Sequence, residues 1–144
     1  MAPAEGKAEI LVPAVVGIPG IDSQHEALYG YLNDFIQLNL EKAPERQKVR
    51  ESFDRLVHYT LSHFDDEEFF MRSIHYPDFE RHAELHRNLR EAVDEYSGRF
   101  ETETNLCRFT GEIVEFLKYW LKHHIFIEDT RIARFYRGER PDAD

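Results

Sequence analysis

The sequence has a single cysteine, Cys107, among its 144 residues. One cysteine can form neither an internal disulfide nor a thiolate cage for a metal, whereas small secreted domains usually carry paired cysteines. We therefore expect a protein of the reducing cytoplasm. Its place between Leu106 and Phe109, near the start of a predicted helix, suggests that Cys107 is a small buried apolar side chain.

Basic residues and long apolar runs are also scarce. Lys and Arg number 18 against 28 Asp and Glu, so the formal net charge is -10. Such a charge repels nucleic acid and anionic membrane surfaces, and we expect neither as a partner. The apolar stretch 10–21 is interrupted by Pro13, Gly17, Pro19 and Gly20, so it is neither a signal peptide nor a membrane span.

The remaining composition is that of one ordinary domain. Hydrophobic residues make up 42% of the chain and aromatic residues 13%, which is enough for a core. We expect a single domain over residues 1–144. Within it, residues 1–21 form an N-terminal tail and arm, 22–136 form the folded body, and 137–144 form a C-terminal tail.

Four segments show apolar residues at helical spacing. They run from about Ser23 to Leu40, from Pro44 to Tyr76, from Pro77 to about Gly98, and from about Leu106 onward. Asp22 and Ser23 are good N-cap residues for the first segment. The turns are short, so we predict an all-α fold, an antiparallel up-down-up-down four-helix bundle with an extended N-terminal arm.

Histidine is unusually frequent, with eight in the chain. Two pairs of potential metal ligands are four residues apart, His63 with Glu67 and His82 with His86. Residues at this spacing lie on one face of a helix, one turn apart. Each pair can therefore direct two donor atoms toward the same point.

The heights of these groups in the bundle can be compared, because residues equally far from a turn lie side by side in an antiparallel helix pair. The midpoint between His25 and His63 falls in the first predicted turn. The midpoint between His63 and His86 falls in the second, and that between His86 and His124 falls in the third. Six potential ligands thus share one level of the interior: His25, His63, Glu67, His82, His86 and His124.

So many ionisable groups at one buried level would be costly without a metal ion. Nitrogen-rich ligation with a carboxylate suits iron, zinc, copper or nickel better than magnesium or calcium, and the donors exceed what one tetrahedral zinc ion takes. We predict two metal ions, with iron favoured.

Several short motifs on all four predicted helices resemble those of the bacterial hemerythrins. They are I-D-S-Q-H at 21–25, H-F-D-D-E-E at 63–68, H-A-E-L-H at 82–86 and W-L-K-H-H-I-F-I-E-D at 120–129. The resemblance extends from residue 21 to about residue 136. It implies a non-haem di-iron centre, bridged by an oxo or hydroxo group, that binds dioxygen.

The resemblance also assigns ligands. It implies one iron bound by His82, His86 and His124, a second bound by His25 and His63, and two bridging carboxylates, Glu67 and Asp129. The second iron then keeps one open position for dioxygen. Leu28 and Trp120, each one turn from a ligand, are candidates for lining this oxygen pocket, although either can equally be ordinary core.

Asp129 is the ligand that spacing alone does not support. It follows His124 by five residues, about 140° around a regular helix. It can bridge only if the helix ends or distorts near Phe126. Glu128 has the better helical spacing, but the family pattern selects Asp129. The other histidines, His58, His75 and His123, we interpret as structural or solvated.

The expected function is reversible dioxygen binding for transport, storage or buffering in the cytoplasm. The chain is not expected to be an enzyme. An alternative is an oxygen or redox sensor that signals to a partner protein. A di-iron enzyme acting on peroxide or nitric oxide is a third hypothesis.

Overall fold

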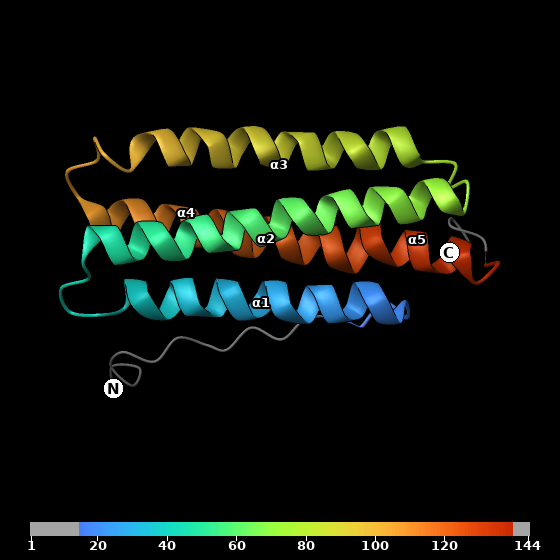
Figure 1. Cartoon of the computed structure of the whole chain (residues 1–144), viewed down its shortest axis with the longest axis horizontal. Coiled ribbons are helices and arrows are strands. Elements are labelled where there is room, and N and C mark those ends of the chain that lie inside the picture. The colour runs from blue at the N-terminus through green and yellow to red at the C-terminus, as the bar shows by residue number, and fades with distance from the viewer. Residues whose placement is uncertain (1–14, 140–144) are drawn as a thin grey trace.

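A computed structural model describes residues 15–139 of the chain. The helices are α1 (Pro19–Asn39), α2 (Arg46–Ser73), α3 (Phe79–Arg99) and α4 (Leu106–His123), and α4 continues into a π-helix, η1 (His124–Asp129), and α5 (Thr130–Tyr136). Successive rods run in opposite directions (Figure 1). The predicted all-α, antiparallel four-helix bundle is confirmed. The predicted tail and most of the arm, residues 1–14, and the last five residues lie outside the described residues.

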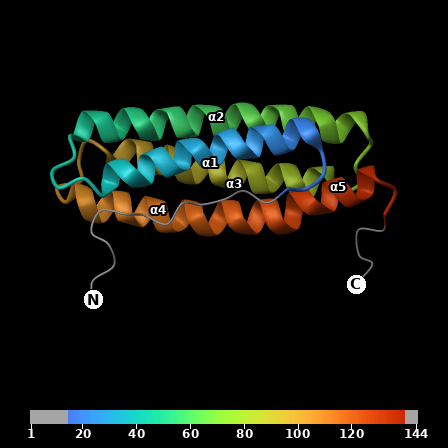
Figure 2. The same ribbon diagram turned by 90° about the horizontal axis from the view of Figure 1, so that it is seen from below.

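The rods form a closed bundle in which α1 packs on both α2 and α4 (Figure 2). Rod α4 extends through η1 and α5 without a break in direction (Figure 1). In this arrangement, residues equally far from a turn lie side by side, which is the geometry that the midpoint comparison assumed.

Helix α1 begins four residues earlier than predicted. Its N-cap is Ile18, and Pro19 occupies the first turn, where its missing N–H is no loss. Asp22 is therefore not the N-cap. Its carboxylate instead accepts hydrogen bonds from the backbone N–H groups of Val16 (2.7 Å) and Gly17 (3.1 Å). Asp22 thus fastens the described end of the arm, where Val16 is buried, to the start of the bundle.

The turn between α2 and α3 is closed by a residue in the left-handed region. His75 has φ 55°, and the N–H of Tyr76 donates to the carbonyl of Met71 (2.9 Å). This is the Schellman arrangement, in which glycine is usual at the left-handed position. His75 is exposed, so its imidazole remains in solvent.

One half of the bundle interior is filled by aromatic rings. Phe53 lies 5.8 Å from Phe35 and 5.1 Å from Phe100, and Phe100 lies 5.0 Å from Phe109, between ring centroids. All four side chains are at most 1% exposed. We call this half the apolar end. It lies where α1 and α3 end and where α2 and α4 begin, on the left of Figure 1.

The prediction that Cys107 is buried is wrong. Its thiol is exposed, because the inward stripe of α4 passes through Phe109 and Ile113. Cys107 precedes Phe109 by two residues, which is about 200° around the helix. Among the described residues no helix is long and apolar enough to cross a membrane.

Candidate metal centre

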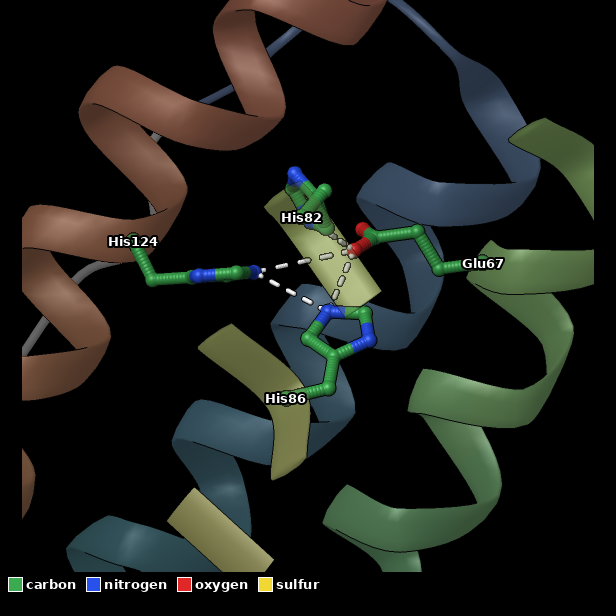
Figure 3. A group of neighbouring side chains, drawn as sticks. All are labelled: Glu67, His82, His86 and His124. Atoms are coloured by element: carbon green, nitrogen blue, oxygen red, sulfur yellow. Dashed lines mark hydrogen bonds and ion pairs between the residues drawn. The ribbon is translucent and has the colours of Figure 1, made fainter. Parts of the chain in front are cut away.

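The six potential ligands predicted to share one level do converge, and Asp129 joins them. All seven side chains are buried, with at most 3% exposure: His25, His63, Glu67, His82, His86, His124 and Asp129. Their donor atoms form two groups that share Glu67, and within each group all the atoms lie within 4.8 Å of one another. Figure 3 shows the first group, with the side chains from α2, α3 and the start of η1 pointing toward one another.

The first group has three imidazoles around one carboxylate oxygen. Glu67 Oε1 lies 2.8 Å from His82 Nε2 and 3.0 Å from His86 Nε2, and the Nε2 atoms of His86 and His124 are 3.2 Å apart. Adjacent ligands of an octahedral ion with bonds of about 2.1 Å are separated by about 3 Å. The spacing of these donors therefore matches the coordination shell of one transition-metal ion.

The second group has two imidazoles and draws on both carboxylates. His25 Nε2 lies 2.8 Å from Asp129 Oδ2, and His63 Nε2 lies 3.5 Å from Glu67 Oε2. The other oxygen of Asp129, Oδ1, is 3.2 Å from His82 Nε2 in the first group. Glu67 and Asp129 thus each direct one oxygen toward each group, which is the arrangement required of bridging carboxylates.

The distortion that Asp129 requires is present in the structure. Residues 124–129 form a π-helix, in which hydrogen bonds span five residues instead of four. Each turn is wider, so Asp129 returns to the face of His124, and its Oδ1 lies 3.1 Å from His124 Nε2. A π-helix at a functional site is a recurrent feature of proteins.

Glu128, the alternative ligand, has a different partner. Both of its carboxylate oxygens accept hydrogen bonds from the Arg81 guanidinium, at 2.6 and 2.9 Å. Glu128 is buried, whereas the Arg81 side chain is half exposed. Glu128 and Arg81 are the sequence neighbours of Asp129 and His82, so this ion pair ties together two segments that supply the centre.

The buried site contains both carboxylates and imidazoles, and these groups shift one another's pKa values. Burial raises the pKa of Glu67, but hydrogen bonds from His124, His82 and His86 outweigh it and hold the pKa well below its usual value. For His124, burial acts to lower the pKa, yet the Asp129 and Glu67 carboxylates raise it to about 10. Protons on imidazoles therefore balance the ionised carboxylates, and a bound cation would replace those protons.

Several buried polar atoms lack a hydrogen bond within the described part of the chain. They include both ring nitrogens of His25, Oε2 of Glu67 and both carboxylate oxygens of Asp129. His25 Nε2 and Asp129 Oδ2 are within ion-pair distance, but their geometry is not that of a hydrogen bond. Buried groups of this kind are normally satisfied. Because His25 Nε2, Glu67 Oε2 and Asp129 Oδ2 are close together in the second group, this donor set fits a metal ion there.

Two side chains that the sequence analysis missed orient the imidazoles. His63 Nδ1 donates to Gln24 Oε1 (2.7 Å), and His86 Nδ1 donates to Glu68 Oε2 (2.8 Å). These bonds leave both Nε2 atoms free to bind metal, and outer partners of this kind raise metal affinity. The signal was available: Glu68 and His86 are equally far from Pro77.

Aromatic rings cover the three-histidine group. The Phe64 ring is stacked on His86, 3.8 Å between centroids and 6° between planes, and Trp120 is stacked on His124, at 4.5 Å and 12°. Phe64 was not predicted as part of the site. Trp120 lies beside the three-histidine group, and Leu28 is buried in the core. The oxygen pocket assigned to these two residues stays a prediction.

The three other histidines lie outside both groups. His58, His75 and His123 are exposed, as predicted for solvated side chains. His123 stacks on Tyr119 at the surface, with 6.2 Å between ring centroids.

Comparison with known proteins identifies the family. The model of the hemerythrin HHE cation-binding domain matches residues 16–136. Bacteriohemerythrin from Stenotrophomonas maltophilia is 32% identical over 118 residues, which are 82% of this chain and 74% of the relative. The Pseudomonas aeruginosa protein of the same name is 31% identical over 113 residues (78% and 71%), and that of Clostridium acetobutylicum is 26% identical over 116 residues (79% and 89%). The chain belongs to the hemerythrin family.

Proposed function

We propose that the chain binds dioxygen reversibly at a non-haem di-iron centre. The observation that carries the proposal is the pair of carboxylates, Glu67 and Asp129, each directed toward both groups of imidazoles. Dioxygen is the ligand that the resemblance to hemerythrins implies. The ligands would be His25, His63, Glu67, His82, His86, His124 and Asp129.

The unequal numbers of imidazoles in the two groups support a binding position on one side. An octahedral ion takes about six ligands. His82, His86 and His124, with one oxygen from each of Glu67 and Asp129, would supply five of these ligands to one ion. The group of His25 and His63 has one nitrogen fewer, so its donors would leave one more position for an outside ligand. Two bound iron ions would supply the reversible two-electron chemistry that dioxygen binding needs.

The surrounding residues would hold the imidazoles in place and keep the centre dry. Gln24 and Glu68 hold the His63 and His86 rings by their Nδ1 atoms. Phe64 covers the three-histidine group and is completely buried. Leu28 and Trp120 would complete the apolar surroundings. Exclusion of water favours release of intact dioxygen over irreversible oxidation of the centre.

The role we propose is transport, storage or buffering of dioxygen in the cytoplasm, without turnover of a substrate. Sensing is the second candidate because one structural feature favours it. The π-helix that carries His124 and Asp129 also exposes Phe126 and Ile127 on its outer side. A partner protein could read the state of the centre there.

Metal analysis combined with visible absorption tests the proposal. We expect two irons per chain. We also expect an absorption band that appears when the reduced protein is exposed to air and disappears under vacuum. Zinc in the purified protein, or no band that depends on dioxygen, would contradict dioxygen binding. Rapid turnover of hydrogen peroxide or nitric oxide would favour an enzyme.

A further inference from the structure

An apolar cavity lies one helical turn from the proposed metal centre. It is enclosed by residues of α2, α3 and α4, among them Thr60, Leu89 and Leu121. Thr60 precedes His63 by three residues, Leu89 follows His86 by three, and Leu121 precedes His124 by three. Residues three apart are neighbours on one helix face. Three walls of the cavity therefore adjoin three of the proposed ligands.

The wall of this cavity offers almost nothing to water. Its lining side chains are aliphatic except for Thr60. The Thr60 hydroxyl donates to the backbone carbonyl of Leu56 (2.7 Å), so its hydrogen is already used. A buried water normally needs two to four polar partners. The cavity is therefore suited to a small apolar molecule.

The cavity also lies close to the surface. Leu61 and Val57 belong to its lining and are only partly buried. By contrast, the proposed ligands are at most 3% exposed, so a gas molecule has to cross packed side chains to reach them. Phe64 follows Leu61 by three residues, so the two are neighbours on one face of α2, and the Phe64 ring stacks on His86.

The size of the cavity limits what can enter. Its volume is about 10 Å³, close to the smallest that holds one water-sized molecule. A larger organic ligand does not fit, whereas a diatomic gas needs only the rotamer fluctuations that side chains make in picoseconds to nanoseconds.

From its position, dryness and size, we infer that this cavity is a transient docking site for dioxygen on its route between solvent and the metal centre. The inference rests on the proposed function. A docking site on the route lowers the free-energy barrier for entry and for exit by the same amount. It therefore changes the association and dissociation rate constants by the same factor and leaves the affinity unchanged.

Replacing Leu61 tests the route in both directions. Leu61→Phe fills the cavity, and both rate constants measured by stopped-flow absorption should fall about tenfold. Leu61→Ala enlarges it, and both should rise. The affinity should stay within about twofold of the wild-type value in each case. The control is Leu106, also partly buried but outside the cavity, whose Phe and Ala variants should leave both rate constants unchanged.

A crystal of the protein pressurised with xenon gives a readout that does not depend on the metal. Xenon density in the wild-type cavity, lost in Leu61→Phe, supports the docking site. An empty cavity under xenon overturns it, as does unchanged dioxygen kinetics in both Leu61 variants. If the wild-type protein shows no dioxygen-dependent band at all, the proposed function fails, and this result is distinct from a normal band with unchanged kinetics.

Discussion

Phe53 in the apolar end and His86 in the proposed metal centre are both completely buried, but their surroundings differ in kind. Phe53 contacts other aromatic rings, which need no partner beyond close packing. His86 contacts a carboxylate, another imidazole and the Phe64 ring. The apolar end therefore needs no partner beyond its own packing, whereas the centre is a set of polar groups that a bound cation would complete.

The largest effect is expected when a buried aromatic ring is removed from the apolar end. Phe53→Ala should lower the free energy of unfolding by about 3–5 kcal/mol, because it removes a fully buried ring. The loss should be the same with and without iron, as measured by urea denaturation. The visible spectrum of the iron-loaded variant should match that of the wild type, and a changed spectrum would mean that the two halves are coupled.

Removal of iron should have a slightly smaller and more local effect. Binding to the folded state alone stabilises it by about 4 kcal/mol when free ligand exceeds Kd about 1,000-fold. Hydrogen exchange should show the loss around His86 and the π-helix, while amides near Phe53 and Phe109 keep their protection. Uniform loss of protection would contradict the difference between the halves.

The third prediction concerns a pair of substitutions that distinguishes Asp129 from Glu128. Asp129→Ala should abolish the spectrum of the di-iron centre, because it removes a bridging carboxylate. Glu128→Gln should keep the spectrum but weaken iron binding about 10- to 100-fold, because Arg81 would no longer hold the neighbouring segments. Iron titration measures the second effect. Glu112→Gln, which breaks an exposed pair with Arg99, is the control and should change neither property.

The smallest effect concerns the turn beyond the metal centre. His75→Gly should stabilise the protein by about 0.5 kcal/mol, since glycine adopts a positive φ without strain but loses more entropy on folding. His75→Ala keeps the strain and should give no gain. Thermal unfolding of the two variants gives the comparison, and equal midpoints would show that the left-handed position carries no strain.

The parts of the site that depend on straight helices could be predicted from the sequence. His25, His63 and His86 lie on long antiparallel helices, so their distances from the turns determine their height. The apolar neighbours of Cys107 predict its burial, but its position around α4 places the thiol on the exposed side. The start of α1 was misplaced because Asp22 binds backbone outside the helix instead of capping it.

Other features depend on packing or on backbone geometry that no residue type specifies. The π-helix could be inferred only from the position that Asp129 needed, because a change of hydrogen-bond register has no sequence signature of its own. The cavity beside Thr60 and Leu89 depends on how side-chain volumes meet across three helices. The bond between Glu68 and His86 agrees with the midpoint comparison, because the two residues are equally far from Pro77.

The π-helix also affects the rod beyond the metal centre. Buried residues recur at every fourth position over 109–133: Phe109, Ile113, Leu117, Leu121, Ile125, Asp129 and Ala133. In a regular helix each step of four overshoots a full turn by about 40°, so the inward stripe would slowly wind away from the interior. The wide turn at 124–129 corrects this accumulated phase. It therefore aligns the final turns, with Ile132 and Ala133 buried, and lets one continuous rod serve both the core and the centre.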